Sequence, residues 1–181
     1  SPGVGTQQSF YEDASVYDVL HTPGTAREVD GLARIEARFV PEHARGVWLE
    51  PACGTGRYLR VATRRGKRVI GFDRSAGMVA YARDRHERLG LSGVFFEADM
   101  TDFASRARPK CGLAFNPINS VRHLMSDAAM LAHLEQVSIA LRRGGVYALG
   151  LSTCACGLEC ESEDVWSARR GGTRVRQVVQ Y

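Results

Sequence analysis

Lysine, long apolar runs and an export signal are scarce or missing in this sequence. Only two of its 24 basic side chains are lysines, Lys67 and Lys110. No run of about 18 apolar residues occurs, so we expect no membrane-spanning helix. The first residues lack the basic and apolar regions of a signal peptide, and the cysteine count of five is odd. Both observations favour a cytoplasmic chain with free thiols.

The remaining composition is typical of one globular domain. The chain has 181 residues, 44% of them hydrophobic and 24% charged, which is enough for a sizeable core. This balance excludes a disordered tail and a disulfide-stapled miniprotein. The net charge of +4 comes from scattered arginines that form no basic stripe. We therefore expect no nucleic-acid partner. The sequence does not tell which oligomeric state the protein has.

Three cysteines lie close together near the C-terminus, at Cys154, Cys156 and Cys160. A structural zinc site needs four ligands, and no histidine nearby completes the set. We therefore expect no metal.

The hydrophobic pattern alternates between helical and strand periods along most of the chain. Helices are expected at Phe10–Leu20, Thr25–Phe39, Arg57–Arg65, Ser75–Leu89 and Ser126–Leu141, the last ended by Gly144 and Gly145. Strands are expected at Val47–Leu49, Arg68–Phe72, Gly93–Glu97, Leu113–Asn116 and Val146–Leu151. This alternation predicts an α/β fold, a Rossmann-like, doubly wound and mostly parallel sheet covered on both faces.

The C-terminal segment breaks this alternation. Glu163–Tyr181 is typical of a hairpin that turns near Gly171 and Gly172, with a late antiparallel strand. No further strand follows, so we expect the chain to be C-terminally incomplete. The sequence thus predicts a single domain with an N-terminal helical cap at 1–45, a Rossmann-like core at 46–151 and a hairpin region at 152–181.

The strongest motif is Glu50–Gly56, with the sequence Glu-Pro-Ala-Cys-Gly-Thr-Gly. A strand ends in an acid and passes through small residues into a helix. Glycines allow a ligand to approach the backbone closely, and the helix N-terminus offers free N–H groups. A pyrophosphate would not be placed beside the Glu50 carboxylate, whereas a ligand with an amino group and a sulfonium would.

Two further acids follow the next two strands. Asp73 ends the second strand, about 20 residues after the glycine-rich turn, where nucleotide-binding folds reach ribose hydroxyls. Asp99 and Met100 follow the third strand, where a carboxylate can accept from an adenine amino group and a thioether can pack on the base. Because parallel strands end at one edge of a sheet, Glu50, Asp73 and Asp99 are expected to converge there.

In this order the segments resemble the class I S-adenosylmethionine-dependent methyltransferase family, of the small-molecule type. The resemblance rests on Glu50–Gly56, Gly71–Met78 and Glu97–Met100, and on Arg142–Gly145, where arginine takes the family's proline position. It implies S-adenosylmethionine as cofactor and methyl transfer by in-line displacement to a nitrogen or oxygen atom of a small metabolite.

The resemblance also implies a set of cofactor-binding residues at the matching positions. They are Tyr17 as a lid; Glu50, Ala52, Gly54 and Gly56 at the methionine and ribose end; Asp73 on the ribose hydroxyls; Arg74 and Met78 beside adenosine; Asp99 and Met100 on adenine; and Phe115 and Asn116 beside the methyl donor. Ala52 departs from the family's usual glycine.

The stretch after the fourth strand concerns the acceptor. Asn119–Leu124 resembles the N-S-x-x-H-L pattern of small-molecule methyltransferases, which include sugar N-methyltransferases. The resemblance implies that His123 faces the acceptor, where an imidazole can remove or relay a proton at neutral pH. An alternative is the N-P-P-Y motif of amino-group methyltransferases acting on nucleic acid or protein. Asn119 stands where that motif needs an aromatic ring.

Two other functions remain open. A nicotinamide-dependent oxidoreductase would require a third glycine in its turn, and Gly54-Thr55-Gly56 is followed by Arg57, Tyr58 and Leu59. The second alternative is a catalytically inactive domain that binds S-adenosylmethionine or another nucleoside.

Overall fold

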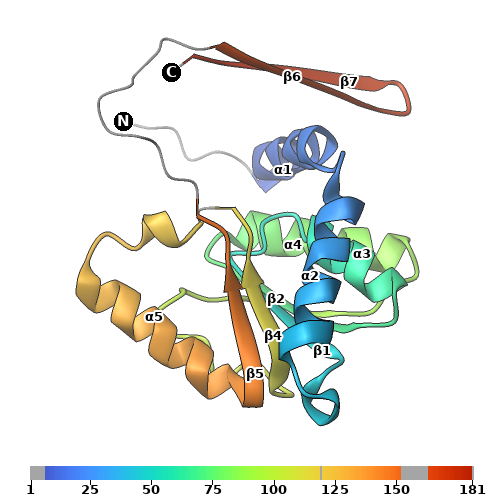
Figure 1. Cartoon of the computed structure of the whole chain (residues 1–181). Helices are drawn as coiled ribbons and strands as arrows, with labels where there is room; N and C mark the ends of the chain where they lie inside the picture. Colours follow the sequence, from blue (N-terminus) through green and yellow to red (C-terminus); the bar gives the residue numbers. More distant parts are fainter. Residues whose placement is uncertain (1–6, 119, 152–162, 181) are drawn as a thin grey trace.

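The chain folds around a five-stranded parallel sheet. The computed structural model describes residues 7–118, 120–151 and 163–180. The strands are β1 (Val47–Pro51), β2 (Arg68–Asp73), β3 (Val94–Glu97), β4 (Cys111–Asn116) and β5 (Leu141–Leu149), in the spatial order β3-β2-β1-β4-β5 (Figure 1). Every pair is parallel, so all five carboxyl ends lie at one edge. This confirms the expected Rossmann-like sheet.

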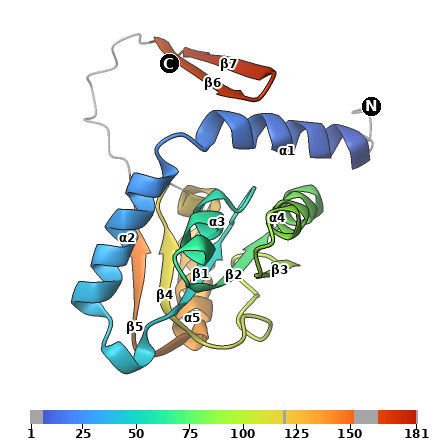
Figure 2. The same cartoon turned by 90° about the vertical axis from the view of Figure 1, so that its right-hand side faces the viewer.

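Helices cover both faces of the sheet, as the alternating pattern predicts. The helices are α1 (Gln7–His21), α2 (Thr25–Phe39), α3 (Arg57–Arg64), α4 (Ala76–Arg88) and α5 (Asp127–Ala140), with short 3-10 helices η1 (Glu42–Ala44) and η2 (Ser120–His123). Figure 2 shows α2 and α3 on the opposite side of the sheet from α5.

The core consists of two layers, one on each face. Because side chains alternate along a strand, Trp48 packs with Val29 and Leu59 beneath α2 and α3. Its neighbour Leu49 packs on the other face with Val137 of α5. All five β1 positions are buried, as expected for a central strand covered on both sides.

The C-terminal hairpin forms a sheet of its own. Strands β6 (Glu163–Arg170) and β7 (Thr173–Gln180) pair antiparallel, with Arg170 opposite Thr173 next to the turn. This confirms the late antiparallel strand, which pairs within the hairpin and apart from the main sheet. Helix α1 lies between the hairpin and the carboxyl edge of the main sheet (Figure 2). Within the described ranges, no helix is long and apolar enough to cross a membrane.

The predicted junction between the last helix and the last strand of the main sheet is wrong. Helix α5 ends at Ala140, and Leu141 is already extended and pairs with Cys111, so Gly144 and Gly145 do not end the helix. They lie inside β5, where the register with β4 shifts. A Cβ on Gly144 would approach Pro41 Cγ to 2.7 Å, so the glycine accommodates close packing and a positive φ of 82°.

Candidate functional site

A cavity of about 460 Å³ opens at the carboxyl edge of β1, β2 and β3. Residues from five separate segments line it, beginning with α1 and ending with η2 and the residue after it. Most of the residues that the sequence nominates meet here: Tyr17, Ala52, Gly54, Asp73, Arg74, Met78, Asp99, Met100 and His123. The topology therefore brings together residues that are more than 100 positions apart in the chain.

Asp73 is held at the end of β2 by two backbone groups. Its Oδ2 accepts from the Gly54 N–H at 2.9 Å, and its Oδ1 accepts from the Ser75 N–H at 2.9 Å. Ser75 in turn caps α4 by accepting from the Met78 N–H. An ionised carboxylate has about four acceptor positions, so Asp73 retains capacity for ligand hydroxyls while it joins β2 to the glycine-rich turn.

Asp99 lies on the exposed side of the same cavity. Its Oδ1 accepts from the backbone N–H and the hydroxyl of Thr101, and these hydrogen bonds lower the pKa of the carboxyl. The carboxylate therefore stays ionised and available as an acceptor near neutral pH.

Met100 is positioned by a histidine that sequence reasoning missed. The buried His133 of α5 places Nδ1 2.9 Å from the Met100 carbonyl and Nε2 2.8 Å from the Tyr147 hydroxyl. If Nδ1 carries the proton and donates to that carbonyl, Nε2 accepts from Tyr147. Burial lowers the pKa of His133, which favours this neutral form. His133 lies 33 positions after Met100 in the chain, so no local pattern in the sequence indicates it.

A second, smaller cavity of about 90 Å³ adjoins the first. The two share Tyr17, Ala52, Gly54 and Ser120 in their linings. Glu50 lines the smaller cavity, is 4% exposed, and has one oxygen, Oε2, without a hydrogen bond among the described residues. Burial raises the pKa of Glu50 well above its ordinary value, although the nearby Arg57 opposes the shift.

Asn116 forms the other wall of the smaller cavity. Its side-chain Nδ2 donates to the Pro51 carbonyl at 2.9 Å, and its Oδ1 accepts from the Ser120 N–H. These bonds tie the end of β4 to the end of β1 and to the start of η2. The opening between β1 and β4 is therefore fixed by one buried amide.

Gly56 and Phe115 lie outside both cavities. A Cβ on Gly56 would approach Ala82 Cβ to 3.2 Å, so this glycine allows close packing of α3 on α4. The Phe115 ring is fully buried between Trp48 and Tyr58. Ala52 lines both cavities in a left-handed conformation, with φ of 51°, which explains why glycine is common at this position.

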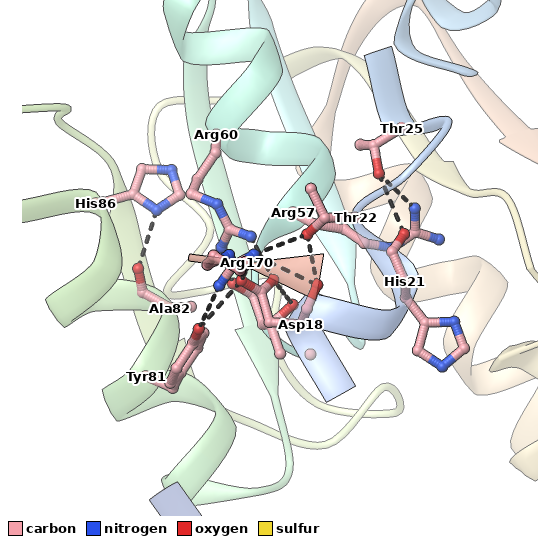
Figure 3. A network of polar contacts seen from close by, with 12 residues as sticks. Asp18, His21, Thr22, Thr25, Arg57, Arg60, Tyr81, Ala82, His86 and Arg170 are labelled. Atoms are coloured by element: carbon pink, nitrogen blue, oxygen red, sulfur yellow. Dashed lines mark hydrogen bonds and ion pairs between the residues drawn. The ribbon is translucent and has the colours of Figure 1, made fainter. Parts of the chain in front are cut away.

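Tyr17 of helix α1 lines both cavities. Its neighbour Asp18 holds the helix in place through a network of polar contacts (Figure 3). The fully buried Asp18 carboxylate pairs with Arg60 of α3 and accepts from Thr55 Oγ1 at 2.7 Å and from Tyr81 OH at 3.1 Å. Arg170, next to the hairpin turn, pairs with it at 2.8 Å. One carboxylate therefore joins the lid helix, the glycine-rich turn, α3, α4 and the hairpin.

The charge of Asp18 is stabilised by these partners. Burial by itself would raise the pKa of the carboxyl, but the Arg60 guanidinium and the hydrogen bonds from Thr55, Arg60 and Arg170 lower it below its ordinary value. Asp18 and Arg170 belong to no recognisable motif, and they are 152 positions apart in the chain. The sequence therefore gives no signal for this network.

Comparison with known proteins agrees with this geometry. A family model described as "Methyltransferase domain" matches residues 49–145, more than half of the chain, and the chain belongs to this family. It is 32% identical over 142 residues to dTDP-3-amino-3,6-dideoxy-alpha-D-glucopyranose N,N-dimethyltransferase of Streptomyces fradiae. That alignment covers 75% of this chain and 51% of the relative, so the chain spans about half the length of this curated relative.

Solved structures show the same fold at lower identity. DesVI of Streptomyces venezuelae has a TM-score of 0.69 and 23% identity, with 93% of this chain and 82% of that chain covered. The glycopeptide N-methyltransferase MtfA, in complex with S-adenosyl-L-homocysteine, has a TM-score of 0.58 and 23% identity, with 87% and 64% covered.

No cluster of three or more histidine, cysteine or carboxylate side chains suited to a metal occurs in the part of the chain that the structure describes. The cysteines at 154, 156 and 160 lie outside that part. The expectation of no metal therefore stays a prediction.

Replacing Asp18 by asparagine tests the network. We expect D18N to lower the free energy of unfolding by about 3–5 kcal/mol, because it leaves the buried Arg60 guanidinium without a counter-charge. The control is D30N, which removes an exposed ion pair with Arg65 and is expected to cost less than about 1 kcal/mol. Urea denaturation measures both, and equal losses would show that Asp18 has no special role.

Replacing Glu50 by glutamine tests the buried acid. We expect E50Q to raise the free energy of unfolding of the ligand-free protein at neutral pH by on the order of 1–3 kcal/mol, because it removes an unsatisfied buried carboxylate. The gain should disappear as pH falls towards about 4.3, where an unfolded glutamate is also protonated. Urea denaturation across this range checks it, and a variant less stable than the wild type at neutral pH would contradict it.

Proposed function

We propose that this chain is the catalytic domain of an S-adenosylmethionine-dependent methyltransferase that methylates a nitrogen or oxygen atom of a small metabolite. One observation carries the proposal: the ends of β1, β2 and β3 bring Glu50, Asp73 and Asp99 to two adjoining cavities. Membership of the methyltransferase family supports it. The expected cytoplasmic location remains part of this proposal.

The residues present fit this cofactor. Glu50 Oε2 is a buried acceptor without a partner among the described residues, which suits the ammonium group of the methionine end. Asp73 retains acceptor capacity for ribose hydroxyls, and Asp99 and Met100 line the same larger cavity for adenine. The acids at the strand ends also match a donor that carries positive charge.

Methyl transfer requires the protein to align the acceptor atom with the methyl group more than to activate that group further. When bound, S-adenosylmethionine supplies a methyl group that its sulfonium sulfur already activates. Tyr17 on α1 lines both cavities, where it is placed to cover the cofactor when it binds. His123 lines the larger cavity on η2, from where it accepts the proton that the acceptor atom loses as the new bond to carbon forms.

An amine on a sugar-like metabolite is the acceptor that the comparisons favour. The Streptomyces fradiae relative is named as an N,N-dimethyltransferase of an amino sugar linked to dTDP. The N-P-P-Y alternative is not favoured, and Asn119, on which it depends, lies outside the described residues. An inactive nucleoside-binding domain would bind the cofactor but release no S-adenosylhomocysteine with any acceptor.

Asp73 offers the most direct test of cofactor binding. We expect D73A to weaken S-adenosylhomocysteine binding by about ten- to a hundred-fold, because it removes a charged acceptor of ligand hydroxyls. Isothermal titration calorimetry measures the affinity, and circular dichroism checks that the fold persists. The control is D84N, which also removes an aspartate charge but from the ion pair that Asp84 forms with the exposed Arg88. Unchanged affinity in D73A would count against the assignment of the cavity.

Replacing His123 by alanine tests the methyl-transfer step. Turnover is followed as S-adenosylhomocysteine release with a panel of nucleoside-diphosphate amino sugars and simple amines. We expect H123A to lower the rate by roughly 10²–10⁴-fold, the usual contribution of a general base, with cofactor affinity little changed. Wild-type rates in H123A would remove the residue from the mechanism.

A further inference from the structure

Helix α1 carries Tyr17 to the cavities but buries little apolar surface of its own. Among its side chains that the structure describes, the buried hydrophobic ones are Ala14 and Val19. Val16 and Tyr17 are about half exposed, at 47% and 46%. A helix in a protein is stabilised mainly by packing of its apolar face, and one alanine and one valine supply little of it. The other contacts of α1 therefore decide how firmly it stays in place.

The C-terminal hairpin contacts α1 at two points, both on one face of β6. Trp166 meets His21 edge-on, with the ring centres 5.5 Å apart. Arg170 pairs with Asp18 at 2.8 Å. Because side chains alternate along a strand, positions 166 and 170 point to the same face. The ring of His21 in turn lies 4.1 Å from that of Tyr17, so the hairpin reaches the residue that lines both cavities through one imidazole.

Arg170 is the part of the Asp18 network that can separate from α1 without leaving a buried charge unpaired. Its Nη2 also donates to Thr22 Oγ1 at 3.2 Å, and its Nη1 donates to Tyr81 OH of α4 at 3.4 Å (Figure 3). The Arg170 side chain is 32% exposed, whereas that of Asp18 is fully buried. When Arg170 leaves, Asp18 keeps its ion pair with Arg60. The hairpin contact is therefore separable from the rest of the network.

We propose that Arg170 is a positioning residue for the cofactor site: through it the hairpin clasps α1 and holds Tyr17 at the cavities, and breaking the clasp speeds cofactor exchange. This inference rests on the proposed function and gives the hairpin a role, although no described hairpin residue lines either cavity. A ligand under a lid leaves when the lid opens, so the contacts that hold the lid set the rate of release. Arg170 acts through α1, not by touching the ligand.

The test compares R170Q with R174Q, which removes the same charge from the other face of the hairpin. Arg174 lies opposite Arg169 in the strand pair and has no ion pair among the described residues. Radiolabelled S-adenosylhomocysteine is bound and then chased with excess unlabelled ligand. We expect R170Q to release it about ten- to a hundred-fold faster than the wild type, the effect of losing one charged hydrogen bond. R174Q should match the wild type, and R170K, which keeps the charge, should lie closer to the wild type than R170Q.

Hydrogen exchange of the ligand-free protein gives a second readout, which a general loss of stability would not reproduce. We expect R170Q to speed exchange of the α1 amides by about tenfold or more and to leave the α3 amides unchanged. An equal increase in both helices would show that Arg170 acts on the whole fold, and the inference would fail. A release rate in R170Q equal to that in R174Q would overturn it as well.

W166A breaks the other contact and decides the matter if circular dichroism shows that R170Q does not fold. We expect W166A to release S-adenosylhomocysteine about three- to tenfold faster, since an aromatic pair contributes less than a charged hydrogen bond. Wild-type release in W166A would then overturn the inference. If the wild type binds no S-adenosylhomocysteine, the proposed function itself is wrong, and exchange of the α1 amides alone decides whether the hairpin holds the helix.

Discussion

Parallel pairing throughout the main sheet is the constraint on which the rest of the structure depends. Because β1 pairs with β2 on one side and with β4 on the other, helices return the chain over both faces of the sheet, α3 and α4 on one and α5 on the other. Every strand then delivers its last residue to the same edge. Glu50, Asp73 and Asn116, which are far apart in the sequence, therefore all lie at this edge.

The second determinant is the buried carboxylate of Asp18. It fixes α1 across the carboxyl edge of the sheet, so Tyr17 lines both cavities. Thr55 of the glycine-rich turn and Arg170 of the hairpin share this carboxylate. One charged group therefore links the lid helix, the turn and the hairpin.

The smaller cavity contains a buried acid that lacks the stabilising partners of Asp18. Asp18 is surrounded by donors and its carboxylate is stabilised, whereas the buried Glu50 has an oxygen, Oε2, without a hydrogen bond among the described residues, and burial raises its pKa. A site with a buried, unsatisfied carboxylate is less stable when empty and gains from a ligand that satisfies that carboxylate. Stability and binding are thus expected to respond in opposite directions when Glu50 is neutralised.

The sequence by itself determined the order of the elements and the motif at each strand end, because apolar periodicity and turn residues act over a few neighbouring positions. It therefore predicted the parallel sheet and nominated Glu50, Asp73 and Asp99. Only the tertiary structure decided which side chains face the cavities. Gly56 and Phe115 belong to the motifs yet pack in the interior, whereas Arg57 lines the site. Asp18 pairs with Arg170 across 152 positions. Such choices depend on burial against distant segments, which local pattern does not encode.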